Sequence, residues 1–101
     1  MEEQMSILKQ VLIEELERNN HFIDSAEKEI SQLPIGYISK KNINNKTYFY
    51  YQWREGEKIK SEYIKKKDVQ NLDKKIKRRK ELEEAVLKAK NENKRIERAL
   101  K

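Results

Sequence analysis

Residues 44–56, in the middle of the chain, are the segment most informative about its fold: Asn44-Asn45-Lys46-Thr47-Tyr48-Phe49-Tyr50-Tyr51-Gln52-Trp53-Arg54-Glu55-Gly56. Aromatic residues dominate it, and pleated strands favour aromatic and β-branched side chains. An Asn-Asn pair precedes the aromatic run and a glycine ends it. Both residue types tolerate the positive φ angles of tight hairpin turns. The stretch therefore predicts a strand that lies between two reversals of the chain.

Pairing this strand with the segments on either side predicts a three-stranded antiparallel meander over residues 36–64. A two-residue turn at Asn44-Asn45 places Ile38 opposite Tyr51 and Lys40 opposite Phe49. Side chains alternate between the two faces of a strand, so this register divides them into two sets. The expected core face carries Ile38, Phe49, Tyr51 and Trp53. The expected polar face carries Ser39, Lys41, Tyr48, Tyr50 and Gln52.

The third strand is expected to follow a three-residue loop, Arg54-Glu55-Gly56, with the glycine in the left-handed conformation. In that register Ile59 and Tyr63 join the core face. The residues that alternate with them join the polar face beside Tyr48 and Tyr50, and these are Lys58, Lys60 and Glu62. A slip of one residue in either turn exchanges the two faces.

Apolar residues recur three and four positions apart on both sides of the sheet segment, which is the period of one helix face. The first run predicts a helix over residues 3–33, with a stripe formed by Met5, Leu8, Leu12, Leu16, Ile23, Ala26, Ile30 and Leu33. The second predicts a helix over residues 67–100, with a seam formed by Val69, Leu72, Ile76, Arg79, Leu82, Val86, Ala89, Asn93, Ile96 and Leu100. We therefore expect one α+β domain over residues 1–101, with a long helix on each side of the meander and coiled-coil-like pairing of the helices.

A pair of asparagines, Asn19-Asn20, interrupts the apolar stripe of the first helix. A buried asparagine can fix the register of paired helices. The same pair can instead mark a local weakness of the helix. The sequence leaves both interpretations open.

Catalytic and metal-binding patterns are missing. The chain has one histidine, no cysteine and two glycines. His21 alone cannot form a histidine-based triad or a two-histidine zinc site, and two glycines leave no phosphate-cradling loop. The carboxylates of Glu81, Glu83 and Glu84 lie in a charged helical run without a cleft. We therefore expect a non-enzymatic protein with no cofactor and no metal.

The longest apolar run near the N-terminus is Val11 to Ile13. A membrane span needs roughly 20 apolar residues and a signal-peptide core needs about 7–15. We therefore expect a cytoplasmic protein that has no membrane partner.

Basic residues outnumber acidic ones, with 24 Lys and Arg against 18 Asp and Glu and a net charge of +6. Such a balance attracts anionic partners over a long range, and nucleic acid is the first candidate. A Lys-, Asn- and Ile-rich composition caused by an AT-rich genome would give the same balance without any such partner. Charge alone therefore favours nucleic acid without identifying it.

Two basic surfaces are candidate binding sites. The predicted polar face of the sheet combines cations for phosphates with rings for stacking, and its candidate residues are Lys41, Tyr48, Tyr50, Arg54, Lys58 and Lys60. The start of the second helix carries a basic run, and its candidate residues are Lys74, Lys77 and Arg78. A helix that covers the tyrosines, or a solvated helix face paired with acids four residues away, would explain both features without a ligand.

Three segments carry a family resemblance: Leu33-Pro34-Ile35-Gly36-Tyr37-Ile38-Ser39-Lys40-Lys41, residues 44–56, and Lys60-Ser61-Glu62-Tyr63-Ile64. They resemble a family of small uncharacterised proteins from bacteria, their phages and mobile elements, over about residues 33–80. The order of three strands and a helix is also similar to the arm-site DNA-binding domain of tyrosine recombinases, whose sheet enters the major groove. The long N-terminal helix and the lack of a recombinase catalytic domain depart from that pattern.

Two classes of function follow from these observations. The first is a nucleic-acid-binding protein that uses the sheet face and the basic helix. The alternative is an inhibitor or adaptor from a phage or mobile element, similar to an anti-CRISPR protein, which binds a host protein or nucleoprotein complex. A homodimer formed through the long helices is compatible with either class.

Overall fold

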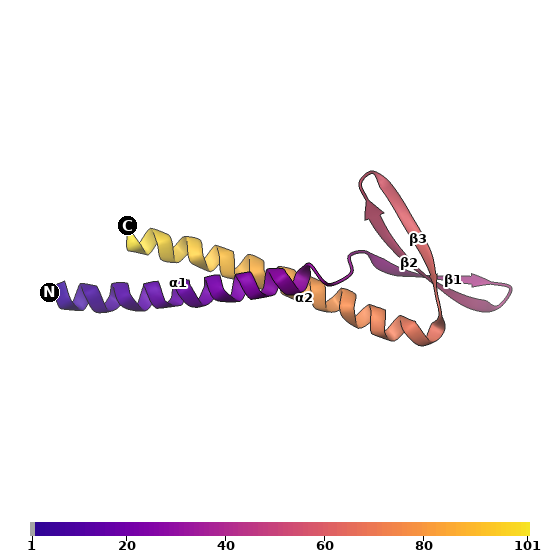
Figure 1. Cartoon of the computed structure of the whole chain (residues 1–101), viewed down its shortest axis with the longest axis horizontal. Helices are drawn as coiled ribbons and strands as arrows, with labels where there is room; N and C mark the ends of the chain where they lie inside the picture. Colours follow the sequence, from indigo (N-terminus) through magenta and orange to yellow (C-terminus); the bar gives the residue numbers. More distant parts are fainter. Residues whose placement is uncertain (1) are drawn as a thin grey trace. The chain divides into compact units, whose positions relative to one another are not determined.

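The computed structural model describes the backbone of residues 2–101 and the side chains from residue 7 onward. The elements follow in the order α1 (Glu2–Ile30), β1 (Tyr37–Ile43), β2 (Lys46–Glu55), β3 (Lys58–Ile64) and α2 (Lys66–Leu100) (Figure 1). The predicted α+β fold is confirmed, and most element boundaries differ from the prediction by one to three residues. The chain forms two compact units. The helical unit comprises Met1–Ser31 and Glu81–Lys101, and the sheet unit comprises Gln32–Lys80.

The helical unit is an antiparallel pair formed by α1 and the second half of α2. Lys90 Nζ lies 3.1 Å from Glu27 Oε1. Asn93, which follows Lys90 in α2, accepts a hydrogen bond of 2.9 Å at its Oδ1 from Nδ2 of Asn19, which precedes Glu27 in α1. The order of these two contacts shows that the helices run antiparallel. Apolar residues of both helices are buried between them, and these are Ile23, Ala26, Leu82, Val86 and Ile96. The predicted pairing of the helices is therefore present within one chain.

The predicted seam of α2 is confirmed at every position, since each of its ten residues is buried or half-buried. The predicted stripe of α1 holds from Leu12 to Ile30, and Leu33, which follows the end of α1, is half-buried. Leu8 departs from it with 67% of its surface exposed. Met5 lies outside the residues whose side chains are described.

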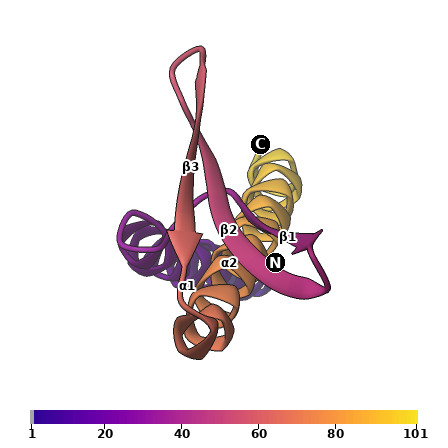
Figure 2. The same cartoon turned by 90° about the vertical axis from the view of Figure 1, so that its right-hand side faces the viewer.

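The first hairpin of the sheet has the predicted register. Ile38 pairs with Tyr51 and Lys40 pairs with Phe49. Asn44 and Asn45 have φ angles of 52° and 64°, as the central residues of a type I′ turn require. In Figure 2, β2 lies between β1 and β3, in agreement with the strand order β1-β2-β3.

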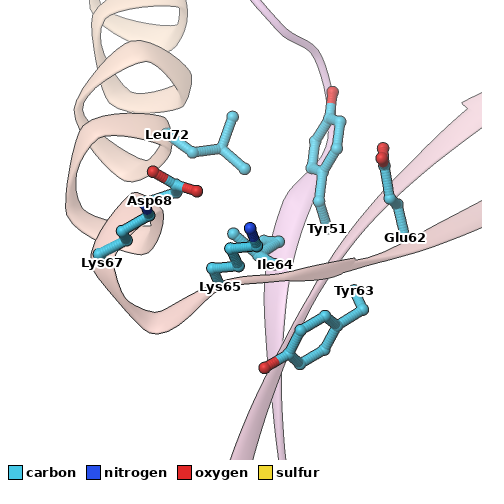
Figure 3. Close-up of a pocket in the computed structure, with 8 residues that line it drawn as sticks. All are labelled: Tyr51, Glu62, Tyr63, Ile64, Lys65, Lys67, Asp68 and Leu72. Carbon is cyan, nitrogen blue, oxygen red and sulfur yellow. The ribbon is translucent and has the colours of Figure 1, made fainter.

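The predicted register of β3 is wrong by three residues, because a loop over residues 54–56 would pair Trp53 with Glu57. Gly56 and Glu57 form a two-residue connection, with a positive φ of 63° at the glycine only, as in a type II′ turn. Tyr63 consequently pairs with Tyr50, and Lys60 pairs with Trp53. Tyr63 and Ile59 therefore lie on the face of Tyr50, while Lys58, Lys60 and Glu62 lie on the core side. Figure 3 shows Tyr63 directed away from the side occupied by Tyr51, Glu62 and Ile64.

The first half of α2 packs on the core face of the sheet. Ile64 at the end of β3 and Ile76 on α2 are buried, with 8% and 4% of their surfaces exposed. Two open pockets remain between sheet and helix. One is lined by Ile38, Phe49 and Val69 among others, and the second by Tyr51, Ile64 and Leu72 among others (Figure 3). The packing on this side is therefore apolar but incomplete.

The segment that connects α1 to β1 is held against the sheet unit by three contacts. Arg79 Nη1 donates to the carbonyl oxygen of Leu33 over 2.7 Å. The Tyr51 hydroxyl donates to the carbonyl oxygen of Ile35. Gly36 has a φ of 101° and approaches Gln52 so closely that a Cβ would overlap the Gln52 carbonyl oxygen. Arg79 in the apolar seam of α2 thus satisfies the backbone of the connecting segment.

Candidate nucleic-acid interface

The strand registers define an outer face of the sheet, opposite the face that packs on α2. Alternate residues of each strand form it, and these are Tyr37, Ser39, Lys41, Ile43, Lys46, Tyr48, Tyr50, Gln52, Arg54, Ile59, Ser61 and Tyr63. All twelve lie in the part of the chain that the structure describes, and none carries a carboxylate. The three acidic residues between positions 37 and 64 are Glu55, Glu57 and Glu62. The outer face is therefore both aromatic and exclusively cationic in its charged groups.

Three tyrosines from adjacent strands form a ring cluster at the centre of this face. The ring centroid of Tyr63 lies 5.9 Å from that of Tyr50, in an edge-to-face arrangement at 71°. It lies 6.5 Å from that of Tyr48 at 56°. Lys41 Nζ lies 5.0 Å from the Tyr50 ring centroid, within the range of a cation–π contact. Tyr48 and Tyr50 are half-buried, whereas Tyr63 is 56% exposed.

Large apolar side chains are exposed at the edges of the outer face. Tyr37 is 53% exposed at the start of β1. Ile43 precedes the first hairpin turn and is 47% exposed, and Ile59 follows the second turn and is 64% exposed. A surface that carries several such groups together marks an interaction site more often than scattered single residues do.

The positive charge of the chain is concentrated in the sheet unit. This unit contains fifteen Lys and Arg residues and five Asp and Glu residues, a net charge of +10. The helical unit contains nine basic and thirteen acidic residues, a net charge of −4. The long-range attraction for anions therefore comes from the sheet unit. The net charge of this unit is larger than the +6 of the whole chain, because the helical unit is acidic.

The nine predicted site residues fall on three separate surfaces. Four of them share the outer face, namely Lys41, Tyr48, Tyr50 and Arg54. Lys58 and Lys60 lie on the core side of β3, where Lys60 Nζ is 4.0 Å from Glu55 Oε2. The remaining three, Lys74, Lys77 and Arg78, are exposed on α2.

On α2, the buried Ile76 faces the sheet. At about 100° per residue, Lys74 and Arg78 project to the opposite side of the helix. Lys77 is paired with Asp73, since Lys77 Nζ lies 2.9 Å from Asp73 Oδ2. The basic helix run and the outer sheet face therefore do not form one continuous surface.

Four residues of the outer face that could contact a ligand, Tyr37, Lys46, Gln52 and Tyr63, were not among the predicted site residues. The register of the first hairpin places Tyr37 and Lys46 on the outer face, but neither residue was assigned to a face from the sequence. Gln52 was placed correctly on the polar face and was not chosen as a site residue. Tyr63 was assigned to the core together with Ile59, because β3 was expected to follow a three-residue loop, Arg54-Glu55-Gly56. A two-residue turn at Gly56-Glu57 would have given the observed register, because glycine at the first central position favours a type II′ turn.

Within the described part of the chain, no group of three or more His, Cys, Asp or Glu side chains is arranged to hold a metal ion. Neither α1 nor α2, as far as they are described, has a stretch apolar enough to cross a membrane.

The family described as Domain of unknown function (DUF6788) matches residues 3–78. The match covers most of α1, the whole sheet and the first part of α2, so the chain belongs to this family. No curated protein and no solved structure matches the sequence.

Proposed function

We propose that this member of the family is a non-enzymatic protein that binds nucleic acid through the outer face of its sheet. The observation that supports this most strongly is the composition of that face, with four tyrosines and three cations and no carboxylate. Cations attract phosphates and aromatic rings stack on bases, which is how sequence-tolerant nucleic-acid-binding surfaces work. The net charge of +10 on the sheet unit adds a long-range attraction to the same ligand.

Charge reversal on the two sides of the sheet provides a matched test. The variant Lys41→Glu/Arg54→Glu changes the outer face by four charge units. The control variant Lys58→Glu/Lys60→Glu changes the core side by the same amount. Both variants weaken long-range steering equally, because they alter the net charge equally. A difference between them therefore reports direct contact with the ligand.

We expect the outer-face variant to bind a labelled oligonucleotide about tenfold or more weakly, and its dependence on salt to be shallower because phosphate contacts are lost. The control should stay within about threefold of the wild type. Circular dichroism checks that both variants are folded. Equal losses in the two variants would contradict a binding site on the outer face. A larger loss in Lys74→Glu/Lys77→Glu would move the site to α2.

A protein partner is the second candidate, and the exposed Ile43 and Ile59 favour it. Aliphatic side chains at two hairpin tips contribute little to phosphate binding but anchor protein interfaces well. An inhibitor or adaptor that binds an acidic host protein or a nucleoprotein complex would use the same cations. Two results together would support this second candidate. The protein would show no affinity for nucleic acid near 50 mM salt. The wild type and the control variant would capture a host protein that the outer-face variant does not capture.

A further inference from the structure

We infer that the ligand of the outer face is single-stranded nucleic acid, with unpaired bases stacked on Tyr37 and Tyr63. This inference rests on the proposed function and specifies its ligand. It concerns the two most exposed rings of the sheet, neither of which was among the predicted site residues. Duplex binding through the same face is the competing arrangement.

The accessible ring faces determine where a base can stack. Tyr50 is half-buried, packs against the Tyr63 ring at a steep angle and lies under the ammonium group of Lys41. Tyr48 is half-buried beside Tyr63. Tyr37 and Tyr63 are 53% and 56% exposed, and both belong to the outer face. The central rings therefore support the cluster, and the two exposed rings are the stacking positions.

Tyr37 and Tyr63 are too far apart for two bases that remain stacked on one another to lie on both rings. Tyr37 is on β1 and Tyr63 is on β3, with β2 between them. Two strand spacings amount to about 9.6 Å, and the register places the two tyrosines a further two positions apart along the strands. Neighbouring bases of a duplex are about 3.4 Å apart, and each is covered by its neighbours on both sides. A base can lie on either tyrosine only if it is separated from its neighbours, which a flexible single strand permits at a small cost.

The residues between and around the two rings fit the other parts of a single strand. Gln52 on β2 lies directly between Tyr37 on one side and Ser61 on the other. Its amide can both donate and accept hydrogen bonds at the edge of an unpaired base. Lys41 and Arg54 extend from neighbouring strands of the same face, where they can reach phosphates.

The test compares three probes of the same sequence, each about 15 nucleotides long: single-stranded DNA, single-stranded RNA and duplex DNA. Fluorescence anisotropy at several salt concentrations measures their affinities for the full chain. We expect one or both single strands to bind at least tenfold more tightly than the duplex at each salt concentration. The comparison of DNA with RNA then identifies which single strand is preferred.

Substitutions of the two exposed rings separate stacking from charge. Tyr37→Leu and Tyr63→Leu should each weaken single-strand binding by roughly 5- to 100-fold, the range of one lost stacking contact, with little change for the duplex. Tyr37→Phe and Tyr63→Phe keep the ring and should stay within about threefold of the wild type. The phenylalanine variants also guard against misfolding, because Tyr63 contacts two other rings.

Three results would overturn the inference. Duplex binding that equals or exceeds single-strand binding would do so while leaving the proposed function in place. Leucine variants that are folded and bind single strands as the wild type does would also do so. Absence of binding to all three probes near 50 mM salt would overturn the proposed function together with the inference.

Discussion

Tyr50 and Tyr63 lie directly opposite each other on β2 and β3, with their ring centroids 5.9 Å apart and their planes at 71°. This pairing determines what each face of the sheet presents. It brings a third ring beside Tyr48 and Tyr50 and removes Lys58 and Lys60 from the same surface. The outer face consequently carries more aromatic rings and fewer lysines than the sequence alone predicts.

The register of β3 can be tested with two isoleucines of that strand. Ile64 is 8% exposed and Ile59 is 64% exposed, and they lie on opposite faces. Ile64→Ala should lower the free energy of unfolding by about 2–4 kcal/mol, because it leaves a cavity against α2. Ile59→Ala should change it by no more than about 0.5 kcal/mol. Chemical denaturation measures both values, and the reverse order would restore the register in which Ile59 faces the core.

The two glycines of the chain provide a second matched pair. An Ala at position 36 meets both a positive φ of 101° and overlap with the Gln52 carbonyl oxygen, and its Cβ would lie 3.0 Å from Trp53 Cβ. An Ala at position 56 meets a positive φ of 63° with no heavy atom within 4 Å. Gly56→Ala should cost about 1 kcal/mol of unfolding free energy, whereas Gly36→Ala should cost more than about 3 kcal/mol. Similar melting temperatures for the two variants would show that the connecting segment does not pack closely on β2.

Tyr51 makes the stability of the sheet unit sensitive to alkaline pH. Burial raises the pKa of its hydroxyl above the ordinary value of 10.0, and the charge of Arg79 opposes part of that rise. The folded state thus favours the neutral hydroxyl, which donates to the Ile35 carbonyl oxygen. Its contribution is present below the ordinary pKa and is lost as the pH rises through the raised value.

Replacement of this tyrosine isolates its contribution. Tyr51→Phe should lower the unfolding free energy at neutral pH by about 1 kcal/mol, the typical value of one hydrogen bond. It should also reduce the loss of stability above pH 10. Denaturation midpoints measured across the alkaline range, with Tyr37→Phe as an exposed control, provide the comparison. An alkaline loss that is unchanged in Tyr51→Phe would assign the effect to another group.

Self-association through α1 is also proposed. Ile7, Leu8 and Val11 are 63%, 67% and 54% exposed, and they lie together on one side of α1, because Val11 follows Ile7 by four residues and Leu8 by three. A second copy that buries these residues would remove a group of exposed apolar side chains from water. Analytical ultracentrifugation should detect a dimer at micromolar concentration, and Ile7→Ser/Val11→Ser should shift it to the monomer. A wild-type protein that sediments only as a species of 12.3 kDa would remove the proposal.

The two helices and their pairing could be predicted from the sequence, because apolar residues recur in them over long and regular periods. Asn93 shows this in detail. It occupies a seam position, and Asn93 Nδ2 donates to Asn20 Oδ1 over 2.9 Å while Asn93 Oδ1 accepts from Asn19. Of the two interpretations of the Asn19-Asn20 pair, this contact supports the register device, because the three side chains match in only one alignment of the helices.

The candidate site was less predictable because it depends on a single turn. A shift of one residue at Gly56 moves every side chain of β3 to the other face. The expected three-residue loop places Ile59 and Tyr63 in the core, whereas the observed two-residue turn directs Ile64 into the core and leaves Ile59 and Tyr63 exposed. The length of this turn therefore determines which residues of β3 are buried.

The most direct test of the central claim is a nuclear magnetic resonance titration of isotope-labelled protein with a short single-stranded oligonucleotide. Binding to the outer face should shift the side-chain amide signal of Gln52 and the ring signals of Tyr37 and Tyr63, because these groups meet the ligand. The signals of Tyr51 and Trp53 on the core face should move much less. Shifts confined to residues 74–80 of α2, or no shifts at all near 50 mM salt, would contradict the account.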